Sequence, residues 1–326
     1  MNFFLIFVFL TLSVYIILNV FAFFKNCMFF FLSEEDISNS KILIIGAHQD
    51  DEISMAGELM NKQMKRELIN EQMKKSKDVK IIITTNGVKR NSPNFKQRSN
   101  IRKNETIKVL EQLNIKKESI SFFDFFVEDD LKVEKNIKIC AKQLFNSIQA
   151  IKPDLIIIPA FEGGHPDHDI TNYITYRITK KINSSNIKLL ETPLYNNYFF
   201  SDIFFSKINK FLYIKYKVFP RFIPNGIQSF ILPKEDNDFL EKKKELLSMY
   251  KSQRPDELIE KFGYRDQFRK FKKHNYSSGP FNQKKNIRFL LLKLITFNKK
   301  KNTFNYGISK EFYEKLYKKL DGNEIT

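Results

Sequence analysis

The chain of 326 residues has a mass of 38.8 kDa, with 42% hydrophobic and 28% charged residues, so it can form a sizeable core and is not a disordered protein. Lys and Arg number 55 against 37 Asp and Glu, and the net charge of +18 favours anionic partners such as phosphates, nucleic acid or an acidic membrane surface. The 2 cysteines, Cys27 and Cys140, exclude a disulfide scaffold, a four-cysteine zinc site and a cysteine-ligated iron–sulfur cluster. Any metal site must therefore use histidine and carboxylate ligands.

The first element predicted from the sequence is one transmembrane helix. Residues 3–24 hold no charged side chain, and at about 1.5 Å per residue a helix of this length spans a hydrocarbon core of roughly 30 Å. A signal peptide is the alternative, but no basic residue precedes the segment, and its apolar run exceeds the ~7 to 15 residues usual for a signal peptide. Lys25 follows the segment, which favours a cytoplasmic location for the rest of the chain. We expect a single-pass membrane protein with an anchor at residues 1–32 and a linker at residues 33–40.

After the linker, segments typical of strands and helices alternate. Strands are predicted at residues 41–47, 79–85, 119–126 and 154–160, with helices between them at about residues 51–75, 95–113 and 129–150. This alternation predicts a Rossmann-like α/β fold, with a mostly parallel sheet covered by helices on both faces. Neither GxGxxG nor GxxxxGK[ST] is present, so dinucleotide binding and P-loop chemistry have no support.

The pattern weakens beyond about residue 188, apart from a helix predicted near residues 236–251. We place the catalytic domain at residues 41–270 and a basic C-terminal extension at residues 271–326. His274 follows two lysines and is expected at the surface, whereas Cys140 lies on an apolar helix face and is expected in the core.

Three of the 4 histidines lie in two short acidic motifs. The first motif, residues 47–52 (AHQDDE), follows the first predicted strand, and the second, residues 165–168 (HPDH), follows the fourth. Parallel strands all end at one edge of a sheet, and ligands bind at that edge in open α/β folds. The two motifs can therefore converge although they are far apart in the sequence.

The residue types in these motifs suit a zinc site. A catalytic zinc takes three protein ligands and leaves a fourth position for water, and His48, Asp51 and His168 can supply the three. His165 lies one turn before His168, and Asp50 can take a proton from a bound water as general base. The alternative is structural, because such aspartates also cap helices at about 1 kcal/mol each. The occurrence of both motifs at strand ends favours the metal site.

Together, the two motifs resemble those of the LmbE-like (PIG-L) zinc deacetylases. The resemblance implies zinc on His48, Asp51 and His168, with Asp50 as the general base. It also implies that His165 stabilises the oxyanion or donates a proton. Asp167 and Glu52 are expected to act as capping residues or as hydrogen-bond partners of the ligands.

The resemblance covers about residues 41–260 and includes further matches. These are Gly87 after the second strand, Arg102 on the next helix, and residues 250–253. In this family Arg102 is expected to reach a polar or phosphate group of the substrate, with a surface arginine as the alternative. The departure is Gln49, where the family usually has proline.

The activity implied by the resemblance is zinc-dependent removal of the N-acetyl group from an N-acetylglucosamine-containing glycoconjugate. The anchor favours a membrane-associated, lipid-linked substrate, and basic stretches at residues 203–222 and 284–301 agree with this, although compositional bias explains them equally well. One alternative is an amidase of the same family that acts on another N-acyl compound, and another is a non-catalytic, membrane-tethered basic binding protein. No RNP, KH or helix-turn-helix signature is present, so nucleic acid is not expected as a partner.

Overall fold

The structure, a computed structural model, describes Ser13 and residues 29–31, 40–69, 79–162, 165–182, 186–194, 230–232 and 239–276. Apart from Ser13, the predicted membrane span at residues 3–24 lies outside the described residues, as do both basic stretches. Among the helices that are described, none has the length and apolar character needed to cross a bilayer.

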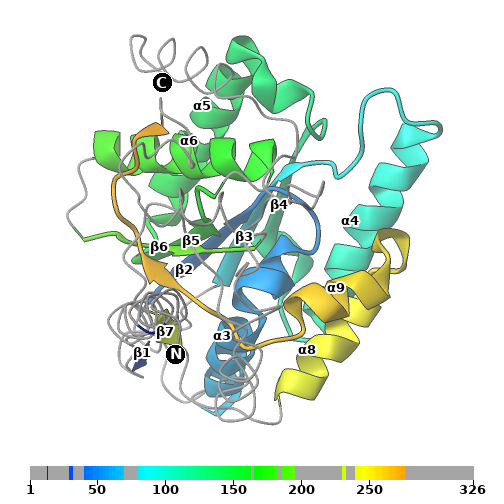
Figure 1. The fold of residues 1–326 in the computed structure, drawn as a ribbon, viewed down its shortest axis with the longest axis vertical. Helices are drawn as coiled ribbons and strands as arrows, with labels where there is room; N and C mark the ends of the chain where they lie inside the picture. The colour runs from blue at the N-terminus through cyan, green and yellow to red at the C-terminus, as the bar shows by residue number, and fades with distance from the viewer. Residues whose placement is uncertain are drawn as a thin grey trace, which may run out of the picture.

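A six-stranded sheet forms the centre of the described structure (Figure 1). Its strand order is β4, β3, β2, β5, β6, β8, and every neighbouring pair is parallel except β6 and β8. The strands are β2 (Ile42–Gly46), β3 (Val79–Thr85), β4 (Ile120–Phe125), β5 (Leu155–Pro159), β6 (Lys188–Thr192) and β8 (Arg269–Lys270). The mostly parallel sheet predicted from the sequence is thus confirmed, with its first four strands within two residues of the predicted bounds.

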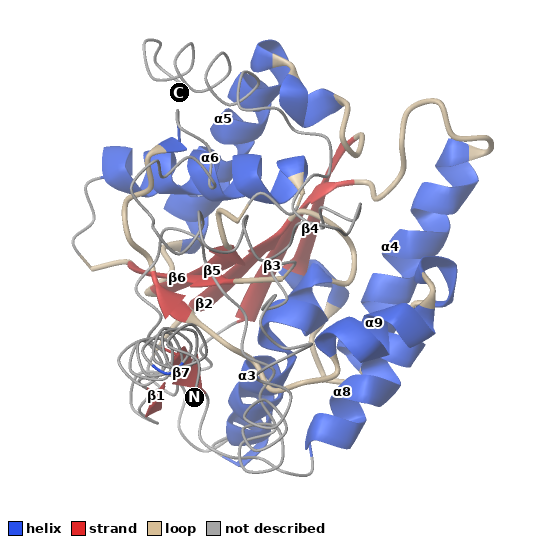
Figure 2. Ribbon diagram, viewed as in Figure 1, coloured by secondary structure: helices blue, strands red, loops and turns tan. Residues whose placement is uncertain are grey.

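Helices cover both faces of the sheet (Figure 2). On one face lie α5 and α6, and on the other lie α3, α4, α8 and α9. The helices are α3 (Asp51–Ile69), α4 (Phe95–Glu111), α5 (Glu134–Ile151), α6 (Pro166–Ile182), α8 (Phe239–Ser248) and α9 (Pro255–Phe262). Ile42 and Ile44 of β2 pack against the α3 face, whereas Leu43 and Ile45 pack against the α5 face. Burial on both faces explains why this strand is a continuous apolar run.

Two short strands, β1 (Phe29–Phe31) and β7 (Phe230–Leu232), form a separate parallel pair. Phe29 pairs with Phe230 and Phe31 with Leu232. β1 lies inside the region predicted as the N-terminal anchor, so this region also contributes a strand.

The surface location expected for His274 is wrong. The side chain is buried, and its Nε2 lies 2.9 Å from Glu191 Oε2 on β6. The chain beyond β8 packs against α6, where the Tyr276 hydroxyl donates a hydrogen bond of 2.6 Å to Asn172 Oδ1. A pair of lysines before a histidine therefore did not indicate exposure here. Cys140 is fully buried, as predicted.

The sheet order places both acidic motifs at one point. β3 lies beside β2, and β4 lies beside β3 at the edge of the sheet, whereas β5 lies on the opposite side of β2. The order thus reverses between β2 and β5, and ligands of open α/β folds bind beside the carboxyl ends of strands at such a reversal. Residues 47–52 follow β2 and residues 165–168 follow β5, so the two motifs are neighbours in space.

Candidate metal centre and active site

The first motif forms a tight turn between β2 and α3. Asp51 is the first residue of α3, and its Oδ2 accepts hydrogen bonds from the backbone N–H groups of Ala47 and His48, both at 2.8 Å. The carboxylate thereby ties the turn to the helix start and fixes the direction of the His48 side chain.

The side chains of His48, Asp51 and His168 meet around one point. His48 Nδ1 lies 3.1 Å from His168 Nε2, His168 Nε2 lies 3.1 Å from Asp51 Oδ2, and His48 Nδ1 lies 3.8 Å from Asp51 Oδ2. Two ligands bonded at about 2.0 to 2.2 Å to a tetrahedral ion lie about 3.3 to 3.6 Å apart. All three residues are buried. Their separations therefore fit one ion such as zinc, and the residues predicted as ligands lie together.

The hydrogen bonds fix which ring nitrogens carry protons. Asp167 Oδ2 lies 3.2 Å from His48 Nε2, so His48 carries its proton on Nε2 and presents the Nδ1 lone pair to His168. Burial, and next the charge of His165, lower the pKa of His48 well below its usual value, which keeps the ring neutral as a metal ligand requires.

The other two predicted ligands share a proton. Burial by itself lowers the pKa of His168, but the Asp51 carboxylate beside it, followed by Glu162 and Asp169, outweighs burial and raises the pKa. Burial likewise acts to raise the pKa of Asp51, yet the charge and hydrogen bond of His168 hold it well below the usual range. A cation can take the place of the His168 proton between these two side chains.

The surroundings of the three histidines hold more carboxyl groups than basic side chains. Arg102 is the basic side chain that acts on both His48 and Asp50, and carboxylates outnumber it. An excess of buried carboxylates favours a bound cation. The buried or partly buried carboxylates at this edge are Asp50, Asp51, Glu52, Glu162, Asp167 and Asp169.

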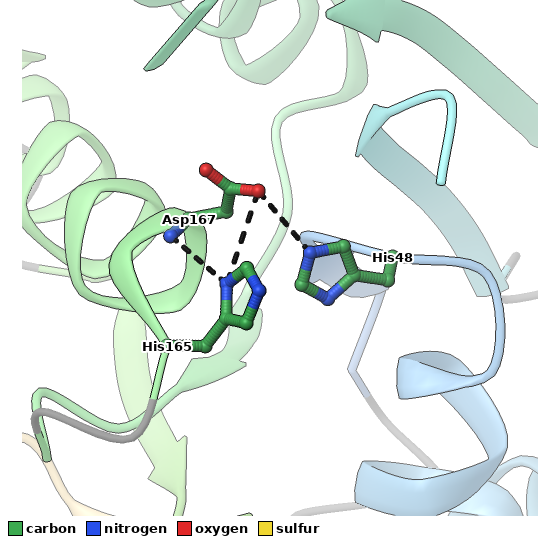
Figure 3. Close-up of side chains that lie close together, drawn as sticks. All are labelled: His48, His165 and Asp167. Atoms are coloured by element: carbon green, nitrogen blue, oxygen red, sulfur yellow. Dashed lines mark hydrogen bonds and ion pairs between the residues drawn. The ribbon is translucent and has the colours of Figure 1, made fainter. Parts of the chain in front are cut away.

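Asp167 lies between His48 and His165 (Figure 3). These three residues form a second group whose ligand atoms lie within 4.8 Å of one another. However, Asp167 Oδ2 already accepts the Glu128 N–H at 2.9 Å, and His165 Nδ1 accepts the Asp167 N–H at 3.2 Å. The His48–Asp51–His168 group thus fits a metal better. Asp167 is placed to orient His48, a predicted ligand, through its second ring nitrogen.

Asp50 lies next to the predicted ligands in a strained backbone conformation. Its φ is +112°, a value that costs a non-glycine residue about 1 to 3 kcal/mol. Its N–H donates a hydrogen bond of 3.1 Å to Glu52 Oε2. Burial, and then repulsion from the Asp51 carboxylate, raise the pKa of Asp50 well above its usual range. Such a carboxyl group beside a metal site is suited to proton transfer.

His165 faces a residue that the sequence analysis missed. Its Nε2 lies 3.6 Å from Glu128 Oε1, and the other oxygen of Glu128 accepts Lys89 Nζ at 2.8 Å. The contact with His165, with a smaller contribution from Lys89, lowers the pKa of Glu128 to about 2 although burial opposes it. Glu128 follows β4 with a φ of +59°, so it reaches the same sheet edge as the motifs. The acidic run at residues 128–130 was the available signal, but it also fits the start of a helix.

Arg102, predicted to bind substrate, is held by protein groups. Its guanidinium donates to the Gly87 carbonyl and to Gln253 Oε1, and its Nη2 lies 3.5 Å from the Gln49 carbonyl. The arginine therefore links α4 to the first motif and to residues 251–253. A contact between Arg102 and substrate stays a prediction.

One family model matches part of the chain. Residues 43–179 match the model of the PIG-L family, which is described as GlcNAc-PI de-N-acetylase. The match includes both acidic motifs and ends within α6. No curated protein is significantly similar to the chain.

Several solved structures are similar in fold at low sequence identity. N,N'-diacetylchitobiose deacetylase from Pyrococcus horikoshii is 17% identical with a TM-score of 0.46, and the alignment covers 73% of this chain and 86% of that one. The A40926 pseudoaglycone deacetylase Dbv21 is 17% identical with a TM-score of 0.42, over 67% and 83% of the two chains. The conserved protein TT1542 from Thermus thermophilus is 12% identical with a TM-score of 0.42, over 73% and 97%. These similarities are too distant to carry an argument about activity.

Proposed function

Residues 43–179 of the chain belong to the PIG-L family, and from this premise we propose that the protein is a zinc-dependent hydrolase that removes an N-acetyl group from an amino sugar. The observation that carries the proposal is the meeting of His48, Asp51 and His168 at the sheet edge, with Asp50 and His165 beside them. Two imidazoles and one carboxylate form a ligand set typical of catalytic zinc.

In this proposal His48, Asp51 and His168 would hold the metal. Zinc held there would polarise an amide carbonyl and bring the pKa of a water molecule to about 7. Asp167 keeps His48 in the tautomer whose Nδ1 lone pair is free for the metal, since Asp167 Oδ2 accepts a hydrogen bond from Nε2–H.

Proton transfer is assigned to two other side chains. Asp50, beside the predicted ligands, takes a proton from the attacking water as general base. His165 has its Nδ1 occupied by a backbone N–H, so its proton lies on Nε2, from which it can donate to the developing oxyanion. The amine then leaves with a proton from Asp50 or His165.

We propose an N-acetylglucosamine-containing substrate with a lipid-linked aglycone at a membrane surface. The support is the family's description, GlcNAc-PI de-N-acetylase, together with the uncharged apolar segment at residues 3–24. In the same proposal this segment is a single-pass anchor, and Lys25 after it favours a cytoplasmic catalytic domain.

The proposal is tested with full-length protein loaded with zinc and a panel of N-acetylglucosamine conjugates with and without lipid. Mass spectrometry measures acetate and the free amine. We expect both products to form in equal amounts, to disappear on chelation and to return when zinc is added. Activity on N-acyl compounds other than amino sugars would favour an amidase of another specificity. If acetate and the free amine still form after chelation, the reaction does not depend on a metal.

A further inference from the structure

The peptide group that joins Gln49 to Asp50 is held from both ends by residues 250–253. Its carbonyl, on Gln49, accepts a hydrogen bond of 2.7 Å from Gln253 Nε2. Its N–H, on Asp50, donates to one carboxylate oxygen of Glu52 at 3.1 Å, and the Tyr250 hydroxyl donates to the other oxygen. One short segment, about 200 residues away in the sequence, thus contacts this peptide group directly and through Glu52.

This peptide group controls where the Asp50 carboxylate lies. A peptide unit is planar and rigid, so fixing its C=O and N–H fixes its whole orientation. The next rotatable bond is the one whose φ is +112° at Asp50. A residue in such a sparsely populated conformation stays there only when surrounding contacts hold it.

Gln253 suits this position because its amide both donates and accepts. While Nε2 donates to the Gln49 carbonyl, Oε1 accepts a hydrogen bond from the Arg102 guanidinium. Arg102 can lie there because Gly87 has no Cβ. A Cβ at Gly87 would lie 2.4 Å from Arg102 Nε and 2.2 Å from Gln49 Oε1.

We infer that Gln253 is a positioning residue for Asp50, acting through the Gln49–Asp50 peptide group. The inference rests on the proposed function, in which Asp50 transfers protons. It adds that catalysis needs the segment after α8, which lies outside the stretch matched by the family model, residues 43–179.

The segment has an independent attachment, which supplies a control. Ser252 donates its N–H to Glu105 Oε1 on α4 at 2.9 Å, and its hydroxyl donates to the other oxygen of Glu105. Ser252→Ala removes the hydroxyl contact but leaves Gln253 in place. It therefore reports on docking of the segment in general.

The test variant is Gln253→Glu, which keeps an oxygen for Arg102 and loses the donor to Gln49. We expect kcat on a small N-acetylglucosamine conjugate to fall about tenfold, with KM and zinc affinity within about twofold of wild type, because the reacting groups are misplaced but the ligands are not. In the metal-free protein we expect faster backbone amide exchange confined to residues 47–52. Gln253→Met, which has neither donor nor acceptor, should behave alike, and Ser252→Ala should resemble wild type in both measurements.

Two results would overturn the inference. One is a wild-type kcat with unchanged exchange in Gln253→Glu, and the other is faster exchange throughout the sheet, which would mean a general loss of stability. If the wild type itself deacetylates no conjugate, the proposed function fails. Faster exchange confined to residues 47–52 in Gln253→Glu would then still support the role of Gln253 in holding this peptide group.

Discussion

His48 uses both of its ring nitrogens, and this divides the site into two halves. Nδ1 faces His168 and Asp51, whereas Nε2 faces Asp167 and, beyond it, His165. In the proposed function, His168 and Asp51 on the Nδ1 side hold the metal, whereas Asp167 on the Nε2 side orients His48 and His165 donates a proton. Substitutions on the two sides should therefore have different effects.

The first prediction compares two histidines of the second motif. His168→Ala removes a ligand atom and leaves the buried Asp51 carboxylate without its partner, so the zinc content should fall to a small fraction of the wild-type value. His165→Ala should keep the zinc and lose about 10²- to 10³-fold in kcat, because an oxyanion donor is lost. Elemental analysis and initial rates measure the two effects. Zinc loss in His165→Ala alone would point to the second ligand group instead.

The second prediction concerns the proposed general base. Asp50→Asn should retain zinc near one equivalent, since Asp50 is adjacent to the ligand set without being part of it. Turnover should fall by about 10²- to 10⁴-fold, the usual contribution of general acid–base catalysis. Wild-type turnover would assign the base elsewhere, and loss of zinc would make Asp50 a ligand.

The third prediction follows from the pKa of Glu128, which is lowered to about 2 from a usual value of 4.5. The folded state then binds fewer protons than the unfolded state in this interval, so Glu128 stabilises the fold above about pH 4.5 and loses this effect as the pH falls toward 2. Urea unfolding of wild type and Glu128→Gln should differ near pH 5 by less than about 1 kcal/mol, because the group is partly exposed. The difference should shrink at lower pH. Glu118→Gln, at an exposed glutamate, serves as the control for the loss of one surface carboxylate.

At the scale of single residues, the sequence was sufficient to predict which side chains form the candidate metal site. It was insufficient to predict the residues that hold the turn beside this site in place. His48, Asp51 and His168 could be predicted because each lies in a motif that follows a parallel strand. The roles of Tyr250 and Gln253 depend on contacts formed across about 200 residues, which no local pattern contains.

Among the elements, strands buried on both faces were the most predictable. β3 runs from Val79 to Thr85, as expected from its continuous apolar run. The helix predicted from residue 129 begins instead at Glu134. Glu128 takes a left-handed conformation, and a 3₁₀ turn at Asp130–Lys132 precedes α5. Acidic residues favour such turns as much as a helix start, so the sequence could not decide between them.

The fourth prediction concerns the turn after β3. Gly87→Ala places a Cβ within 2.4 Å of Arg102 Nε at a residue whose φ is +74°. A left-handed backbone and overpacking each cost about 1 to 2 kcal/mol or more. The free energy of unfolding, measured by thermal unfolding, should therefore fall by at least about 2 kcal/mol.

Gly57→Ala in α3 is the matched control for this turn. The added Cβ would meet its nearest neighbour, Ile53 Cγ2, at 3.4 Å. Gly57 follows a kink in α3 at Ala56, and the added Cβ meets only ordinary contacts, so Gly57→Ala should change the free energy of unfolding by less than about 1 kcal/mol. Equal stability of the two variants would mean that the Gly87 turn rearranges freely.

For the whole molecule, the fifth prediction concerns the N-terminal segment. β1 lies at Phe29–Phe31, so deletion of residues 1–28 leaves both sheets intact. The truncated protein should fold, bind zinc and hydrolyse a soluble conjugate at the full-length rate. It should be much slower on the same sugar in liposomes, because tethering raises the local concentration of enzyme at the membrane. Equal slowing on both substrates would mean that the segment supports the fold, and no slowing would remove the main support for a lipid-linked substrate.

A second truncation tests the contribution of β1 itself. Deletion of residues 1–39 also removes the pairing of β1 with β7, whereas the six-stranded sheet begins only at Ile42. We expect this variant to keep its activity on the soluble conjugate, because the site lies at the edge of the six-stranded sheet, which stays intact.

The spacing of the site along the chain also sets an order of assembly during synthesis, which proceeds from the N-terminus and allows early domains to fold first. The ligand set spans 120 residues, so a nascent chain cannot enclose a metal before His168 has left the ribosome. The Gln49–Asp50 peptide group gains its hydrogen bond only when Gln253 emerges, after about 85 more residues. At the ~5 to 20 residues per second of translation, this leaves an interval of several seconds in which the chain can acquire its metal while its proton-transfer group is still unsecured. Metal capture and catalytic competence would thus be separate events in the biogenesis of this protein.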